Sequence, residues 1–205
     1  MSRELELLKE AVKILEEKEK TEVDNKVELS TLQPGETFKI GEHDFIVLGQ
    51  KLKEMETMAI SKELMAEDVK FDENTRDYKV SNLRRVIETE IQPVIESGVG
   101  ADNIIEHEVR LTSVDMQNEF GSCKCKVRPL TFDEVREFNE YVTNTELNDW
   151  WWTCTPWSTA ARQWPYSLAV VSPSGNINNY AYCYRSGVRP FCILKSNIFV
   201  SKGEQ

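Results

Sequence analysis

The chain has 205 residues and a formal net charge of −10. This length is enough to bury a substantial core in one domain with an appended segment, and the acidic balance excludes broad contact with DNA or RNA, which requires Lys and Arg to neutralise phosphates. The N-terminal residues lack the pattern of a signal peptide, and no apolar run approaches the ~18 residues of a transmembrane helix, so we expect a soluble, cytoplasmic protein without membrane contact.

The five cysteines are odd in number and lack C-x-x-C spacing, so the sequence predicts neither structural zinc nor another metal or cofactor. In a reducing compartment we expect them to be buried free thiols. They are Cys123, Cys125, Cys154, Cys183 and Cys192.

The N-terminal segment, residues 1–28, has the apolar spacing of a helix with one narrow stripe. The stripe follows a 4-3-4-3 pattern at Met1, Leu5, Leu8, Val12 and Leu15. This spacing predicts a short coiled coil and a homo-oligomer formed through residues 1–20, although it covers barely two heptads. A helix packed on its own domain, residues 30–205, remains the alternative.

Strand patterns begin at Thr37. Phe38–Ile40 and Phe45–Leu48 flank a turn and predict a β-hairpin, and Met55–Ile60 predicts a third strand. Four acids lie within residues 68–77, but no Gly occupies the sharp-turn position of a calcium-binding loop and no Glu closes it. We therefore expect a solvated acidic loop there.

Helices are predicted in the middle of the chain. Ser81 can cap one helix that Pro93 should kink or end early and that Gly98 and Gly100 should terminate. Val109–Leu111 predicts a short strand, after which Thr112 or Ser113 can cap a brief helix ending at Gly121. Thr131 to Glu134 form a capping box that begins another helix.

Strands return in the last quarter. Ser167–Val171 and Val188–Leu194 predict strands, with Pro190 at an edge or bulge. Between them Tyr180, Tyr182 and Tyr184 alternate with small residues, which places three phenols on one face of a strand. The chain as a whole therefore predicts an α+β fold with strands at both ends.

The last quarter is also aromatic and basic. All five tryptophans lie between Trp150 and Trp164, and four of the six tyrosines follow. Residues 150–205 contain five basic side chains against one acidic side chain, whereas residues 1–149 contain 20 against 34. This contrast favours a binding surface over a catalytic centre.

Several motifs, taken in order, resemble the DUF6273 family, a bacterial and prophage domain family of unknown function. The motifs are W-W-T-C-T-P at Trp151–Pro156, a strand ending at Ser174-Gly175, and G-V-R-P at Gly187–Pro190. The similarity extends to Phe38–Leu48, Tyr78–Arg84 and Leu111–Ser113, and covers about residues 30–200. Cys154 departs from the pattern, because Arg is common there in the family, and Arg162 is a possible replacement.

The resemblance implies a phage or prophage origin. The family is similar in turn to C-type-lectin-like domains, including phage receptor-binding domains and formylglycine-generating enzymes. It therefore implies a C-type-lectin-like domain in which the N- and C-terminal strands come together, behind an N-terminal helical arm.

Enzyme signatures are missing from the sequence. The two histidines, His43 and His107, lie near no motif, and no nucleophile elbow, phosphate loop or zinc-protease motif is present. A formylglycine-generating oxidase, a lesser alternative, would need a reactive cysteine pair, and packing explains Cys183 and Cys192 better. We therefore expect a domain that is not an enzyme.

The predicted ligand-binding residues combine aromatic faces with guanidinium groups. They are Trp157, Arg162, Trp164, Tyr182, Tyr184 and Arg185. Two ligand classes stay open: a glycan, protein or other surface ligand, and a small anionic, nucleotide-like molecule bound inside a host cell to counter its defence. The first class is compatible with a virion component, and the second places the protein in the host cytoplasm. Arg189 and at least one of Trp151 and Trp152 are expected to be structural, and a core role for the whole tryptophan-rich run is the competing interpretation.

Overall fold

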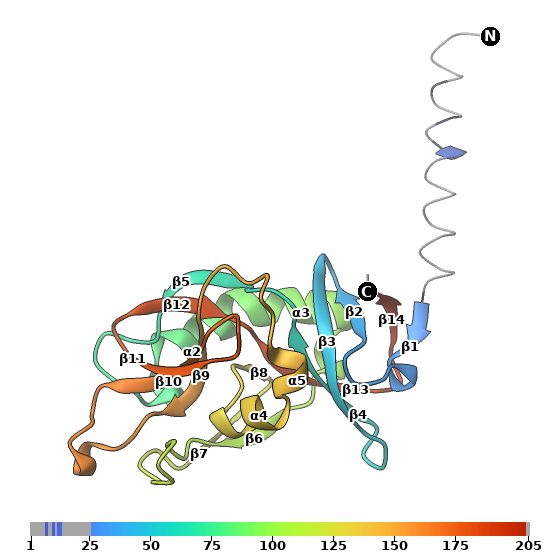
Figure 1. The fold of residues 1–205 in the computed structure, drawn as a ribbon. Coiled ribbons are helices and arrows are strands. Elements are labelled where there is room, and N and C mark those ends of the chain that lie inside the picture. Colours follow the sequence, from blue (N-terminus) through green and yellow to red (C-terminus); the bar gives the residue numbers. More distant parts are fainter. Residues whose placement is uncertain (1–6, 8–9, 11, 14–25, 204–205) are drawn as a thin grey trace.

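The computed structural model describes residues 7, 10, 12–13 and 26–203. It confirms an α+β fold built mostly from sheets (Figure 1). The predicted coiled-coil seam lies largely outside the described residues, since Met1, Leu5, Leu8 and Leu15 are not among them. Val12 is described and its side chain is exposed. None of the described helices is long and apolar enough to cross a membrane.

A seven-stranded antiparallel sheet joins the two ends of the described chain. Its strands, in spatial order, are β1 (Lys26–Glu28), β14 (Phe199–Lys202), β2 (Thr37–Ile40), β3 (His43–Lys51), β4 (Glu56–Ser61), β13 (Phe191–Lys195) and β8 (Val127–Arg128). The predicted hairpin and third strand are therefore confirmed as β2, β3 and β4. Strand β14 pairs with both β1 and β2, so N- and C-terminal strands meet in one sheet.

A five-stranded sheet occupies the other side of the molecule (Figure 1). Its order is β11 (Ile177–Ala181), β10 (Ser167–Val171), β9 (Trp151–Pro156), β12 (Arg185–Val188) and β5 (Ala66–Lys70). A third, two-stranded sheet pairs β6 (His107–Arg110) with β7 (Ser122–Cys125). The prediction of an acidic loop at residues 68–77 was partly wrong, because residues 68–70 lie in β5. This strand is at the edge of the sheet, and its charged side chains protect it from pairing with another chain.

The last predicted strand is in fact two strands in different sheets. Arg189 and Pro190 carry the chain from β12 in the five-stranded sheet to β13 in the seven-stranded sheet. Pro190 has no N–H to offer, but its carbonyl accepts a hydrogen bond from the Ser61 backbone (3.0 Å). Pro190 thus lies where the chain passes from one sheet to the other, so its missing N–H removes no hydrogen bond between paired strands.

The helix that begins at Asn82 continues past Pro93, so the early end that was one of the two expected effects of this proline is wrong. Ser81 caps α2 (Asn82–Val86), one π-turn follows as η3 (Ile87–Ile91), and α3 (Gln92–Val99) carries the proline in its first turn. The wider π-turn accommodates a residue that lacks the backbone donor of a regular helix. Gly98 lies inside α3, where a Cβ atom would meet Ile40 Cγ2 at 2.6 Å, so the helix packs closely on β2.

Short helices complete the fold. They are η1 (Leu29–Thr31), η2 (Tyr78–Val80), η4 (Ala101–Asn103), α4 (Phe132–Glu137), α5 (Asn139–Val142) and η5 (Ala160–Arg162). The capping box at the start of α4 is confirmed, with Thr131 and Glu134 satisfying each other's backbone N–H groups.

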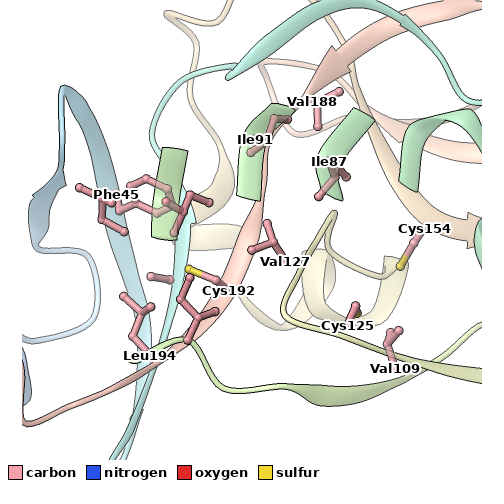
Figure 2. Packing of buried hydrophobic residues seen from close by; sticks show 14 of the residues in the cluster. Phe45, Ile87, Ile91, Val109, Cys125, Val127, Cys154, Val188, Cys192 and Leu194 are labelled. Carbon is pink, nitrogen blue, oxygen red and sulfur yellow. The ribbon is translucent and has the colours of Figure 1, made fainter. Parts of the chain in front are cut away.

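The core has two parts, one on each face of β9. Trp152 packs in the larger cluster, where Ile87 and Ile91 of the helix meet the sheets (Figure 2). Trp151 packs in the smaller cluster beneath α4 and α5. Both indoles are fully buried. The expectation that at least one of them is structural is confirmed, and the structure buries both.

Candidate functional site

A row of ring contacts leads from the core to the surface through the five-stranded sheet. Phe71 meets Trp152 edge to face at 5.7 Å between ring centroids, and Trp152 meets Tyr180 at 6.3 Å. Tyr180 then meets Tyr184 at 6.0 Å. The first two rings are fully buried and Tyr184 is 59% exposed. The exposed ring therefore rests on packed aromatic neighbours.

The alternation predicted that Tyr180, Tyr182 and Tyr184 line one face of a strand. This prediction was wrong. Strand β11 ends at Ala181, whose carbonyl accepts a hydrogen bond from the Tyr184 N–H (2.9 Å) and closes a turn. Tyr184 therefore folds back on Tyr180, while Tyr182 packs on Tyr166 at 6.3 Å. The segment Ala181–Tyr184 contains none of the residues that usually signal a turn, so the pattern could not show it.

The segment 157–166, the aromatic loop, continues β9 at the outer end of this sheet. Trp164 and Tyr166 are 48% and 61% exposed, and Trp157 is half-buried. The loop closes on itself through the Trp164 N–H, which donates to the Thr159 carbonyl (3.1 Å). We define the aromatic surface as the five rings Trp157, Trp164, Tyr166, Tyr182 and Tyr184.

Residues 112–119, the anchor loop, hold one side of the aromatic loop. A brief helix was predicted here, but the Ser113 hydroxyl instead bonds the Asp115 carboxylate (2.5 Å) and takes the Gln117 N–H (2.9 Å), which favours a turn. Asp115 accepts hydrogen bonds from Ser158 Oγ (2.6 Å) and Arg162 Nη1 (3.3 Å). The hydrogen bonds from Ser113 and Ser158 hold the pKa of Asp115 below its ordinary value.

Arg76, which is buried, ties the same two loops together. Its guanidinium donates to the Ser158 carbonyl and pairs with Glu119 Oε2 at 2.9 Å. Glu119 Oε2 in turn accepts the Ala160 N–H (3.2 Å). The aromatic loop is therefore fixed to the anchor loop and to Arg76 by charge-assisted contacts.

The two arginines of the predicted site are occupied by carboxylates. Arg162 pairs with Asp115, and Arg185 Nη1 donates to Asp68 Oδ2 (2.9 Å) and to the Asp68 carbonyl (2.6 Å). Arg185 therefore has a carboxylate partner within the chain. Arg185 lines a separate cavity of about 490 Å³ that contains acids and bases in equal number. Arg189 is confirmed as structural, since it is fully buried and donates to the carbonyls of Ser61 and Val142.

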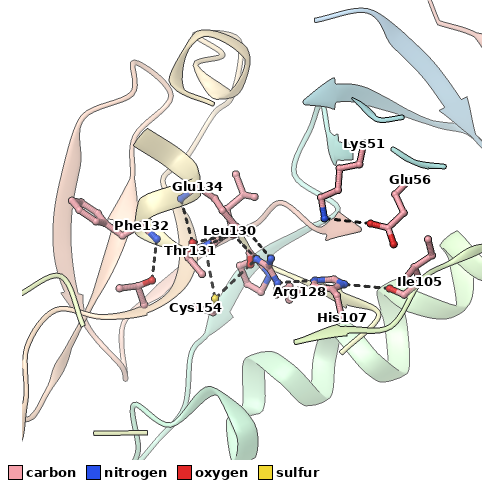
Figure 3. A network of polar contacts seen from close by, with 12 residues as sticks. Lys51, Glu56, Ile105, His107, Arg128, Leu130, Thr131, Phe132, Glu134 and Cys154 are labelled. Carbon is pink, nitrogen blue, oxygen red and sulfur yellow. Dashed lines mark hydrogen bonds and ion pairs between the residues drawn. The ribbon is translucent and has the colours of Figure 1, made fainter. Parts of the chain in front are cut away.

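A buried polar network lies under α4, beside a cavity of about 560 Å³ (Figure 3). Arg128 makes a two-pronged ion pair with Glu134, with both N–O distances at 2.6 Å. Burial by itself would raise the pKa of Glu134, but the bonds from Arg128 and Thr131 outweigh it and leave the pKa lowered. This pair joins β8 to the start of α4.

His107 completes the network as a neutral ring. Its Nε2 accepts a hydrogen bond from Arg128 Nε (2.9 Å), so the ring proton lies on Nδ1 and faces the Ile105 carbonyl (3.2 Å). Burial, followed by the charge of Arg128, lowers the pKa of His107 to about 4. Because both ring nitrogens are engaged, this network is a structural support and provides no free general base.

The His107 network predicts a pH-dependent stability. The pKa is about 4 in the folded protein against about 6.5 in the unfolded chain, so lowering the pH protonates the unfolded state first and destabilises the fold. We expect the protonation of His107 to have almost no effect on the free energy of unfolding above pH 7 and to lower it by about 2 kcal/mol at pH 5, as measured by urea unfolding. His107→Gln should lack this component. An equal loss between pH 7 and pH 5 in both proteins would contradict the assignment.

Sequence reasoning missed Tyr166, the anchor loop and the His107–Arg128–Glu134 network. Tyr166 could have been found as one more aromatic residue in the rich segment. The capping box identified Glu134, but nothing in the local pattern shows that the same carboxylate pairs with Arg128. Among the described residues, no group of three or more His, Cys, Asp or Glu side chains is arranged to hold a metal.

Comparison of the chain with protein families, with curated proteins and with solved structures returns no match. The likeness to the DUF6273 family therefore rests on its motifs and stays a prediction.

Proposed function

We propose that this chain is a non-enzymatic binding domain that recognises a neutral ligand of the glycan class through the aromatic surface. The observation that carries the proposal is the exposure of Trp164, Tyr166 and Tyr184 at the outer end of a sheet whose supporting loops are fixed. Trp is buried on average and Tyr is intermediate, and a group of exposed aromatic rings at one end of a sheet marks an interaction site.

The support beneath the rings favours binding over mere packing. The contacts that tie the aromatic loop to Asp115, Arg76 and Glu119 are made by Ser158, Arg162 and the Ala160 backbone, so none of them uses an exposed ring. A surface that is already ordered loses little conformational entropy when a ligand stacks on it. Indole and phenol rings suit sugars, because the flat face packs on C–H groups and the N–H or hydroxyl can bond the sugar hydroxyls.

The charge distribution favours a neutral ligand over an anionic one. Arg162 and Arg185 are both paired with carboxylates, and the protein as a whole has a net charge of −10. An anion would have to displace those carboxylates and approach an acidic molecule. The nucleotide-like alternative is therefore less well supported than the glycan.

The resemblance to C-type-lectin-like domains that the motifs suggest bears on the fold more than on the role. A C-type-lectin-like arrangement, which we retain as part of the proposal, requires the N- and C-terminal strands to lie together. The pairing of β14 with β1 and β2 supports it. Phage or prophage origin and self-association through residues 1–20 remain part of the proposal as well.

Trp164→Ala is expected to weaken binding and to leave the fold intact. We expect isothermal titration with a panel of neutral oligosaccharides to detect at least one ligand, and the substitution to weaken its affinity by tenfold or more, about 1.4 kcal/mol. Because half of the ring is already in water, the free energy of unfolding should change by less than about 1 kcal/mol.

Leu52→Ala is the matched control, since Leu52 is 73% exposed on the β3–β4 turn, far from the aromatic loop (Figure 1). It should alter neither property. Affinity for the neutral ligand should also barely change between low salt and about 0.5 M salt. If only anionic nucleotides bind, and their affinity falls with salt, the anionic alternative replaces this proposal.

A further inference from the structure

The cavity of about 560 Å³ beside α4 is walled by segments that are far apart in the sequence. Residues of β6, the anchor loop and α4 line it, together with Thr155 of β9. The buried Arg128–Glu134 ion pair of Figure 3 also belongs to its lining, so this part of the wall is held by charge-assisted bonds. Sites for small molecules usually enclose about 300–1,000 Å³. The cavity is therefore of a size that suits a small ligand.

Two arginines line the cavity without a carboxylate partner. Arg110 belongs to β6 and Arg136 to α4, so they come from different walls. Both are exposed, and among the described residues neither makes an ion pair, unlike Arg162 and Arg185. The Cζ atom of Arg136 lies 5.6 Å from the centroid of the Phe132 ring. Each guanidinium group therefore keeps N–H donors for an acceptor that enters the cavity.

The acids of the lining leave these two guanidinium groups unpaired. Glu134 is paired with Arg128, and Glu108 accepts a hydrogen bond from Ser122 Oγ on the neighbouring strand β7 (2.6 Å). Asp133 is exposed and makes no ion pair among the described residues. Since the acids balance the bases in number and the protein is acidic as a whole, a multiply charged phosphate is disfavoured. A single negative charge fits the lining better.

Apolar side chains line the same cavity. Val114 and Met116 come from the anchor loop, and Phe132 comes from α4. Met116 is 85% exposed, more than any other large hydrophobic side chain of the described residues. Its flexible, polarisable side chain can adapt to apolar groups of different shapes. The hydrocarbon part of a ligand would therefore find side chains to pack against close to the two arginines.

We propose that this cavity binds a small organic monocarboxylate. The carboxylate accepts hydrogen bonds from Arg110 and Arg136, whose planar guanidinium groups match its geometry. The hydrocarbon body packs against Met116 and Phe132, which is a contact that an inorganic anion lacks. This site is separate from the aromatic surface and does not depend on the function proposed for that surface.

Binding of acetate, hexanoate and 3-phenylpropionate, each compared with its uncharged amide, tests the proposal in ¹H–¹⁵N spectra of the full chain. We expect hexanoate or 3-phenylpropionate to shift the backbone signals of Thr112, Val114 and Asp133 and to saturate. The matching amide should bind about tenfold more weakly or less, because it cannot form charge-assisted hydrogen bonds. Acetate should also bind more weakly, because it has little hydrocarbon to pack. The indole signal of Trp164 should stay in place.

Arg110→Gln and Arg136→Gln should each weaken the binding of 3-phenylpropionate by about tenfold. Arg85→Gln is the matched control, because Arg85 is exposed and lines a different cavity. It should bind like the wild-type chain, and the far-ultraviolet spectrum checks that each variant is folded. The proposal is overturned if no probe shifts the lining, if acid and amide bind equally, or if both cavity variants bind like the wild type. Equal binding of inorganic phosphate and hexanoate would also overturn it.

Discussion

Glu134→Leu is expected to lower the free energy of unfolding by about 3–5 kcal/mol, because it leaves the Arg128 guanidinium buried without its counter-charge. Arg128 is 2% exposed and both of its terminal nitrogens lie 2.6 Å from the Glu134 carboxylate oxygens. The substitution also removes the capping box, since Glu134 Oε2 accepts the Thr131 N–H (2.8 Å). Urea unfolding at pH 7 measures the loss.

Further variants separate the two contributions. Glu134→Gln can keep the cap and weakens the ion pair, so its cost should be intermediate. The double variant Arg128→Met/Glu134→Leu should cost less than the two single substitutions together, because it removes the charge that the single change leaves stranded. Glu137→Leu, an exposed position on the same helix, should change stability by less than about 0.5 kcal/mol. Equal costs at Glu134 and Glu137 would show that the pair contributes nothing.

Trp152→Ala is expected to cost about 3–5 kcal/mol, the usual loss for a large aromatic side chain truncated in a core. The indole is fully buried, meets Phe71 and Tyr180, and donates from Nε1 to the Val69 carbonyl at 2.7 Å. The cavity left behind would lie beneath Tyr180, the ring on which exposed Tyr184 rests. We expect the same substitution to disorder that end of the aromatic surface.

Trp152→Phe is the matched control for this prediction. It keeps an aromatic ring in the contact row and removes the hydrogen bond to Val69, so the loss should be clearly smaller than for Ala. Trp164→Ala supplies the opposite comparison, because that ring is 48% exposed. If Trp152→Ala and Trp164→Ala destabilise the protein equally, the division of the tryptophan-rich run into a core half and a surface half is wrong.

Much of the fold could be predicted from local patterns. Three local features depend only on residues that are close in the sequence, and each is confirmed. They are the Phe38–Leu48 hairpin, the Ser81 cap and the Thr131 capping box. Failures occurred where tertiary contacts override a local preference. Pro93 was expected to kink the helix or to end it early, and the helix instead continues to Val99 with a π-turn before the proline and with Gly98 packed closely on Ile40.

The candidate site was only partly predictable. Composition pointed to an aromatic C-terminal surface, but the contacts that hold it lie far apart in the sequence. Asp115 bonds Ser158 and Arg162 across 43 and 47 residues, and Arg185 meets Asp68 across 117. No periodicity or motif reports such pairs, so the sequence could not show that both arginines are neutralised. Because both arginines are paired with carboxylates, a neutral ligand is favoured over an anionic one.

The most direct test of binding at the aromatic surface is the indole N–H region of a ¹H–¹⁵N spectrum, recorded as neutral oligosaccharides are added. The five tryptophans give separate reporters, and Trp164→Phe identifies the signal of that ring. We expect the Trp164 resonance to shift progressively and saturate, while the signals of buried Trp151 and Trp152 stay in place. If a neutral oligosaccharide binds the protein and the Trp164 resonance does not shift, binding at the aromatic surface is contradicted.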